Sequence, residues 1–296
     1  MEEQIVYETT THSSPGSTLK LTVFLVAALG MVYLISRSRC GAFYARYITL
    51  IASYIVFGLL FVPILMLNPG SPKNAWWLTK YGNIFQLPLC RLTIKRKGCA
   101  YPEGPFVVVC NHQSSLDSPV IMHDDIWPGN CVVIMKKAMK YTGPFGLCLI
   151  LSGTLFVDRK SSASAKDMLR HAVDAIQKDK RRVWVFPEGT RRLMTEKQSE
   201  EPLLPFKKGA FNLAVLAQVP IVPVVLSSQA KLFSSKEYLF EPGEVTSTVL
   251  PPVPTTGLTL DDVTTLSEEV RAKMIDVFVN QHENGHVVTG GDESKN

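Results

Sequence analysis

His112 and Asp117 lie five residues apart in the stretch "FVVVCNHQSSLDSPVIM" (residues 106–122), and this pair of side chains is suited to moving a proton. A neutral imidazole takes a proton from a hydroxyl group at neutral pH, and a nearby carboxylate orients the ring and stabilises the imidazolium that forms. The apolar run before His112 predicts a short buried strand, which would hold the pair at the edge of a sheet.

The same stretch has a purely structural interpretation. Ser114, followed three residues later by Asp117, resembles a capping box, in which an acid accepts backbone N–H groups at the start of a helix. The two interpretations are compatible, because the acid of a capping box reaches back toward the residues before the helix, where His112 lies.

Basic side chains follow the ends of further apolar runs. The segments are "TLFVDRK" (154–160) with Arg159, "VWVFPEGTRR" (183–192) with Arg191, and "LPFKKGAF" (204–211) with Lys207. Arginine is suited to binding phosphate through paired hydrogen bonds, and Gly189 permits close approach of a ligand to the backbone. Each segment alone is typical of a surface turn or salt bridge. Together with His112, they indicate a lipid phosphate held beside a proton-accepting group.

Two uncharged apolar segments precede these motifs. They are "LTVFLVAALGMVYLI" (21–35) and "YITLIASYIVFGLLFVPILML" (47–67), and the second is long enough to cross a hydrocarbon core of about 30 Å. Residues 1–18 carry acidic but no basic side chains, which does not fit a signal peptide. We therefore expect a disordered tail over 1–18 and a membrane anchor of two apolar helices over 19–67.

The orientation of this anchor is contradictory in the sequence. The linker between the two segments carries Arg37, Arg39 and Arg46, and residues 73–97 are also basic. The positive-inside rule places both regions in the cytosol, whereas two full spans would separate them. One span with one re-entrant segment would keep them together, and the sequence leaves both arrangements open.

Composition excludes several classes of protein. The net charge of +5 is modest, and no alternation of aromatic and basic residues indicates nucleic-acid binding. The six cysteines form no C-x-x-C pair and no zinc spacing with histidine, so neither a metal site nor a disulfide framework is expected.

Short β-rich runs alternate with helical patterns after residue 75, which predicts a layered α/β domain over 75–280. The predicted strands are 106–110, 131–135, 154–157, 183–186, 221–226 and 246–250. The predicted helices are 164–178, 208–218 and 265–280, followed by a disordered tail over 281–296.

Four stretches resemble, in order and spacing, the sequence boxes of the glycerolipid acyltransferases. They are "NHQSSLD", "GTLFVDR", "FPEGTR" and "VPIVPVV" (219–225). The longer stretches around the third and fourth boxes resemble the animal 1-acylglycerol-3-phosphate (lysophosphatidic acid) acyltransferases. The departures are mild: Leu155 and Phe156 in the second box, and Arg192 duplicating Arg191 after the third.

This resemblance implies an α/β domain with a mostly central β-sheet, preceded by an N-terminal helical membrane anchor, integral to the endoplasmic reticulum membrane with its site facing the cytosol. It implies that His112 is the general base and Asp117 its orienting partner. Phosphate contacts would come from Arg159 and from the turn Glu188–Gly189–Thr190–Arg191, and Lys207 would add to them.

The implied reaction transfers a fatty acyl group from acyl-CoA, a co-substrate, to the sn-2 hydroxyl of lysophosphatidic acid, in the presence of membrane lipids. The product would be phosphatidic acid, a precursor in phospholipid and triacylglycerol synthesis. No metal or other cofactor is expected, and the sequence does not specify an oligomeric state. Backbone N–H groups at Ser114–Leu116 are the expected donors to the oxyanion.

Three alternatives remain at this stage. The acceptor could be glycerol 3-phosphate or another lysophospholipid. A hydrolase would use Ser114 or Ser115 as its nucleophile, although the sequence has no G-x-S-x-G elbow. A lipid-binding relative without activity would keep the fold and lose the chemistry.

Overall fold

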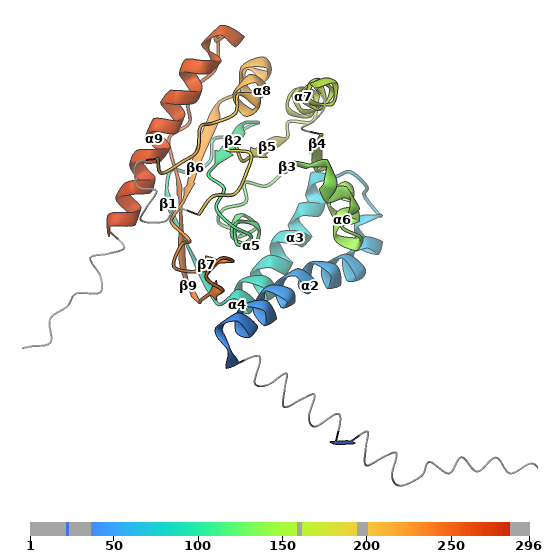
Figure 1. Ribbon diagram of the computed structural model, residues 1–296. Coiled ribbons are helices and arrows are strands. Elements are labelled where there is room, and N and C mark those ends of the chain that lie inside the picture. Colours follow the sequence, from blue (N-terminus) through green and yellow to red (C-terminus); the bar gives the residue numbers. More distant parts are fainter. Residues whose placement is uncertain (1–21, 24–36, 159–161, 194–200, 285–296) are drawn as a thin grey trace, which may run out of the picture.

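The computed structural model describes residues 22–23, 37–158, 162–193 and 201–284 (Figure 1). Its largest sheet has the spatial order β1-β9-β6-β2-β5-β3-β4. The strands are β1 (Leu92–Gly98), β2 (Val107–Cys110), β3 (Cys131–Lys136), β4 (Leu155–Val157), β5 (Arg182–Val185), β6 (Ile221–Leu226) and β9 (Gly243–Val249). Strands β6, β2, β5, β3 and β4 run parallel to one another, and β9 pairs antiparallel to β6. The prediction of an α/β fold with a central sheet is confirmed.

The central strands are buried on both faces. In β2 and β6 every residue is buried, as expected for parallel strands covered by helices on each side. Val107 and Val109 pack into one core, and Val108 and Cys110 pack into the other, because successive side chains of a strand point to opposite faces.

Helices cover both faces of the sheet. Helices α7 (Ser162–Gln177), α8 (Gly209–Ala217) and α9 (Val263–Asn284) contribute to one core, and α2 (Arg39–Leu65), α3 (Ala75–Tyr81), α4 (Leu87–Cys90), α5 (Asp117–Ile121) and α6 (Pro144–Leu151) to the other. Figure 1 shows α7 and α8 above the sheet and α2 along the lower edge of the view. Short 3₁₀ or π segments are Pro72–Asn74, Gly82–Gln86, Lys137–Tyr141 and Leu260–Asp262, and β7 (Phe233–Ser234) pairs with β8 (Leu239–Phe240).

The six predicted strands and three predicted helices are confirmed to within a few residues. The tail predicted from residue 281 is wrong at its start, because α9 continues to Asn284. The predicted tail over 1–18 lies outside the described residues, as does nearly all of the first apolar segment, of which only Thr22 and Val23 are described.

The second apolar segment belongs to a longer helix, α2. It begins after Ser38, whose hydroxyl caps the helix by accepting a hydrogen bond from the Gly41 N–H at 3.0 Å. Of the described helices, α2 has the length and apolarity to cross a membrane. One face of the helix is nevertheless buried, since Leu50 and Phe57 lie in the core that covers the sheet.

Candidate active site

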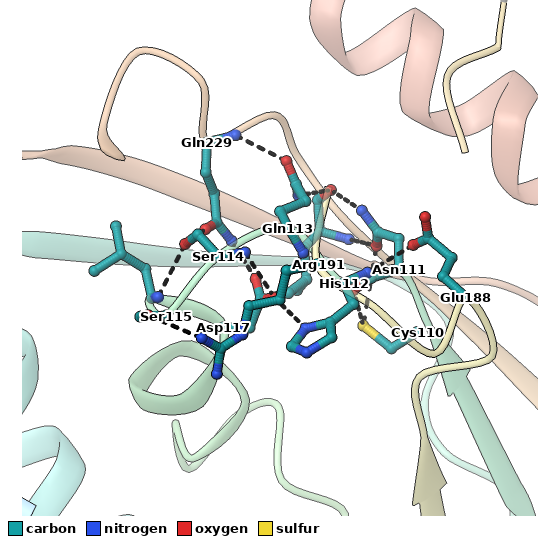
Figure 2. A network of polar contacts seen from close by, with 12 residues as sticks. Cys110, Asn111, His112, Gln113, Ser114, Ser115, Asp117, Glu188, Arg191 and Gln229 are labelled. Atoms are coloured by element: carbon teal, nitrogen blue, oxygen red, sulfur yellow. Dashed lines mark hydrogen bonds and ion pairs between the residues drawn. The ribbon is translucent and has the colours of Figure 1, made fainter. Parts of the chain in front are cut away.

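His112 and Asp117 form a hydrogen-bonded pair at the carboxyl end of β2. The Nδ1 atom of His112 lies 2.7 Å from Oδ2 of Asp117, the first residue of α5 (Figure 2). The same carboxylate oxygen accepts the backbone N–H groups of Gln113 at 2.7 Å and Ser114 at 3.1 Å. The expectation of a capping box with Ser114 at the N-cap is wrong, because the N-cap of α5 is Leu116 and carries no side-chain hydrogen bond. The Asp117 carboxylate instead closes the loop before α5 and binds the imidazole.

This geometry fixes the protonation of the imidazole. An ionised carboxylate only accepts hydrogen bonds, so the ring proton of neutral His112 lies on Nδ1 and the lone pair on Nε2. Within the described part of the chain no hydrogen bond is made to Nε2. The ring stacks on Phe186, with centroids 4.1 Å apart, and its side chain is 19% exposed. His112 is thus oriented to accept a proton at Nε2 from a bound molecule.

Gln229 is a site residue that the sequence reasoning missed. It follows β6, is fully buried, and its Nε2 donates to Oδ1 of Asp117 at 2.6 Å. The signal available in the sequence was positional. Because β6 is a parallel neighbour of β2, the residues after both strands emerge at the same edge of the sheet.

Two more amides tie the loops after β2 and β6 together. The Asn111 side chain accepts the N–H of Leu226 at 2.8 Å and donates to its carbonyl at 3.0 Å. Gln113 donates to the Ser227 carbonyl at 2.8 Å and accepts the N–H of Gln229 at 3.0 Å. The His112–Asp117 pair therefore rests on a hydrogen-bonded frame that joins the loops after two neighbouring strands.

Glu188 has a different role from the one predicted for it. Its carboxylate is buried, and it accepts the backbone N–H of His112 at 2.8 Å and that of Leu204 at 3.1 Å. Burial raises the pKa of Glu188 from 4.5 to about 7, against the lowering effect of the two N–H donors. The side chain faces inward and holds the His112 backbone, whereas the resemblance implied a phosphate contact.

The other predicted phosphate ligands are only partly brought together. Arg191 is exposed, and its Nη1 donates to the Ser115 hydroxyl at 3.1 Å, beside the catalytic loop. Gly189 has a φ of +70°, and a Cβ added there would lie 2.8 Å from Nζ of Lys207, which crosses over it. Thr190 is exposed. Arg159 lies outside the described residues.

The predicted oxyanion donors are mostly engaged elsewhere. The Ser114 N–H donates to Asp117, and the Leu116 N–H donates to the Ser114 hydroxyl at 2.9 Å. Two of the three N–H groups expected to face the oxyanion, those of Ser114 and Leu116, therefore donate within the loop instead.

Two cavities lie near the catalytic pair. One, of about 230 Å³, lies between α2 and the catalytic loop; Arg191 and Ser115 line it with apolar side chains of α2 that include Leu50 and Ile51. The other, of about 440 Å³, is bounded by α7 and α8 and reaches Phe186 and Lys207. The first joins a cationic group to an apolar wall, which suits a lipid with an anionic head group. Among the described residues, no cluster of three or more His, Cys, Asp or Glu side chains is arranged to hold a metal ion.

Comparison with known proteins defines the class. The family model described as Acyltransferase matches residues 73–227, which include the catalytic pair and the Glu188 turn. A crystal structure of the 1-acyl-sn-glycerophosphate (LPA) acyltransferase PlsC from Thermotoga maritima has the same fold. Its TM-score is 0.58 at 20% identity, over 86% of this chain and 100% of that one.

The relatives refine this class. The human 1-acyl-sn-glycerol-3-phosphate acyltransferase alpha is 46% identical over 177 residues, and the match spans 60% of each chain. The human beta form is 33% identical over 275 residues, which is 90% of this chain and 95% of that protein. The 1-acyl-sn-glycerol-3-phosphate acyltransferase of Saccharomyces cerevisiae is 42% identical over 212 residues, 71% of this chain and 68% of that protein. The chain belongs to the 1-acyl-sn-glycerol-3-phosphate acyltransferase family.

Proposed function

We propose that this protein transfers a fatty acyl group from acyl-CoA to the sn-2 hydroxyl of 1-acyl-glycerol 3-phosphate, giving phosphatidic acid. The observation that carries the proposal is the His112–Asp117 pair, with Nδ1 held at 2.7 Å and Nε2 turned away from the carboxylate. The names of the relatives support the choice of acceptor, since the alpha and beta forms are both acyltransferases of 1-acyl-sn-glycerol 3-phosphate.

The chemistry follows from the weakness of the nucleophile. A secondary hydroxyl does not attack a thioester unaided at neutral pH, and His112 takes its proton as the new C–O bond forms. The tetrahedral intermediate then collapses, the C–S bond breaks, and the imidazolium returns the proton to the leaving thiolate of coenzyme A. General-base catalysis of this kind contributes about 10²- to 10⁴-fold. Asp117 holds the imidazole in the required tautomer and stabilises the imidazolium.

The surroundings of the pair support a lysophosphatidic acid acceptor. The Arg191 guanidinium lies next to Ser115 at one end of the 230 Å³ cavity, and α2 supplies the apolar wall. A phosphate bound by Arg191 would place the glycerol hydroxyl beside the catalytic loop, while the acyl chain remained along α2. Positioning of this kind converts a collision between two molecules into a reaction within one complex.

A membrane location is part of the proposal. Helix α2 places exposed Ile48, Leu59 and Leu60 on the side away from the sheet, and both the acceptor and the product prefer a lipid phase. We infer that the protein is integral to the endoplasmic reticulum membrane and acts in phospholipid synthesis from its cytosolic side.

The hydrolase alternative loses support. The Ser114 hydroxyl donates to the side-chain oxygen of Gln229 and accepts the Leu116 N–H, and the Ser115 hydroxyl contacts Arg191 and Tyr47. Among the described hydrogen bonds, neither serine contacts the His112 ring, which a serine nucleophile would need.

Membranes that contain the protein or its His112→Ala variant test the proposal. They are supplied with labelled oleoyl-CoA and with lysophosphatidic acid, glycerol 3-phosphate or lysophosphatidylcholine, and the labelled lipid is followed. We expect phosphatidic acid from lysophosphatidic acid alone, and its loss in the variant. Equal turnover in the variant would remove His112 as the base, and preference for another acceptor would overturn the substrate assignment.

A further inference from the structure

The second oxygen of the catalytic carboxylate has its own partner. Oδ2 of Asp117 binds His112, whereas Oδ1 accepts the side-chain amide of Gln229 at 2.6 Å. Gln229 is fully buried, and Figure 2 shows its side chain directed from the loop after β6 toward Ser114 and Asp117. With the N–H groups of Gln113 and Ser114, four donors converge on this one carboxylate.

The direction of every hydrogen bond in this group is fixed by chemistry. A carboxylate only accepts, so the nitrogen of the Gln229 amide must face Asp117 and its oxygen must face the other way. That oxygen accepts the Ser114 hydroxyl, whose own oxygen accepts the Leu116 N–H at 2.9 Å. The amide therefore has a single orientation, and it presents a donor to Asp117.

The backbone of Gln229 is fixed as well. Its N–H donates to the side-chain oxygen of Gln113 at 3.0 Å, and Gln113 is bound in turn to the carbonyl of Ser227. Gln229 is thereby held on the loop after β6, next to the strand that carries His112.

We propose that Gln229 is a positioning residue for the acyl transfer, because its amide fixes the Asp117 carboxylate so that Oδ2 meets Nδ1 of His112. The expected effect on the rate of acyl transfer rests on the proposed function. The action of the Gln229 amide on His112 through Asp117 does not depend on which substrate is bound. Gln229 is too deeply buried to contact the substrate.

The first test is Gln229→Met, which keeps the length of the side chain and removes its donor. We expect kcat to fall about ten- to a hundredfold, the range found when groups that orient catalytic metal-binding histidines are removed. The KM values for lysophosphatidic acid and acyl-CoA should stay within about twofold, since the substrates do not touch this side chain. An unchanged kcat would overturn the proposal.

The matched control is Gln86→Met. Gln86 is also buried, and its Nε2 donates to the Ser53 hydroxyl at 3.1 Å, with no hydrogen bond to His112 or Asp117 among the described residues. We expect this variant to lose stability in the same way as Gln229→Met but to keep its kcat. Equal losses of kcat in the two variants would show that the effect is general destabilisation.

A double variant asks whether Gln229 acts through Asp117. In an Asp117→Asn background, Gln229→Met should lower the residual rate by less than about twofold, because residues that act as a unit are not additive. A full multiplicative loss in the double variant would mean that Gln229 acts by another route, and the proposal would fail.

A readout without turnover separates this inference from the proposed function. Diethyl pyrocarbonate modifies neutral imidazole, and mass spectrometry of the His112 peptide gives the pH midpoint of its reaction. In Gln229→Met the Asp117 carboxylate loses one of its four donors, so it should stabilise the imidazolium more strongly and shift this midpoint to higher pH, with no shift in Gln86→Met. An unchanged midpoint would overturn the inference even if phosphatidic acid is formed. A shifted midpoint would support it even if the acceptor proves to be another lipid.

Discussion

Glu188 couples three segments of the site through one buried carboxylate. It accepts the N–H groups of His112 and Leu204, and it follows β5, which lies beside β2 in the sheet. Two backbone donors favour its ionised form, whereas burial favours the neutral form, and burial dominates because the pKa of Glu188 is raised to about 7. Near neutral pH this group is therefore only partly ionised in the folded protein.

The raised pKa of Glu188 predicts a pH dependence of stability. The folded protein holds the proton up to about pH 7, whereas the unfolded chain releases it near pH 4.5. The contribution of this group to the free energy of unfolding is complete below about pH 4.5. It falls by on the order of 3 kcal/mol at most as the pH rises toward 7, and it is constant above that pH. Thermal unfolding of the wild type and of Glu188→Gln, compared across this range, should show the wild type losing stability relative to the variant. Parallel curves would contradict the assignment.

Arg191 and Arg192 are adjacent but make different contacts. Arg191 reaches Ser115 at the 230 Å³ cavity, whereas the side chain of Arg192 lies 3.6 Å from Glu201. We expect Arg191→Ala to raise the KM for lysophosphatidic acid about tenfold or more, because a charge-assisted hydrogen bond is worth about 1.5–3 kcal/mol. The measurement is acceptor saturation at fixed acyl-CoA, with Arg192→Ala as the control that keeps its KM. Equal KM values for Arg191→Ala and the wild type would remove the phosphate assignment.

The sequence predicted the His112–Asp117 pair, but it missed Gln229 and the role of Glu188 for a physical reason. One short loop joins His112 and Asp117, so local sequence brings them near each other. Gln229 and Glu188 reach the pair only because β6 and β5 flank β2 in the sheet, and strand order is not written in local spacing. For the same reason a carboxylate in the phosphate-binding box was predicted to face the ligand, although its partner is the His112 backbone.

At the scale of elements, the contact between α2 and α6 fixes the long apolar helix to the rest of the domain. A Cβ added to Gly58 in α2 would lie 2.5 Å from the carbonyl carbon of Pro144, the first residue of α6. The two helices therefore approach at backbone distance. This close approach also brings α2 to the cavity next to the catalytic loop, since Tyr54 of α2 and Phe145 of α6 both line it.

Gly58→Ala should weaken this contact, because the added methyl group meets a backbone that cannot move aside. We expect a loss of about 1–3 kcal/mol, the usual cost of overpacking, together with lower acyltransferase activity. The control is Leu59→Ala at the next position of the helix, whose side chain is 65% exposed. Thermal unfolding and phosphatidic acid formation are measured for each variant in detergent micelles. A Gly58→Ala variant as stable as Leu59→Ala would show that the helices do not pack at this point.

The elements that sequence reasoning missed lack the hydrophobic pattern from which a strand or helix is predicted. Strand β1 carries Lys95, Arg96 and Lys97 at the edge of the sheet, where it pairs with β9 alone. Lys95 and Lys97 are exposed, and Arg96 is half-buried over the Tyr101 ring. Helix α6 is short and apolar throughout, so its pattern shows no period. Among the predicted strands, β2 and β6 are buried at every residue, and their unbroken apolar runs follow directly from burial on both faces.

At the scale of the whole molecule, the packing of α2 is compatible with both basic flanks of this helix lying on the same side of the membrane. A helix that crosses a bilayer alone is surrounded by lipid, whereas α2 buries Phe43, Leu50 and Phe57 against the rest of the protein. With one face on the domain and the other exposed, the helix suits immersion in a single leaflet. Both of its basic flanks, around residue 39 and after residue 73, then lie on the same side without a second span.

This arrangement predicts that the two ends of α2 are reached from one side of the membrane. Cys40, near the start of the helix, is exposed, and Leu67, just past its end, is 84% exposed, so Leu67→Cys provides a matched probe. In sealed vesicles, a membrane-impermeant maleimide should label both positions or neither before permeabilisation, as read from the two peptides by mass spectrometry. Labelling of one position alone would show that α2 crosses the bilayer. The domain packed against α2 would then have to lie against a spanning helix, although the buried face of that helix extends from Phe43 to Leu65.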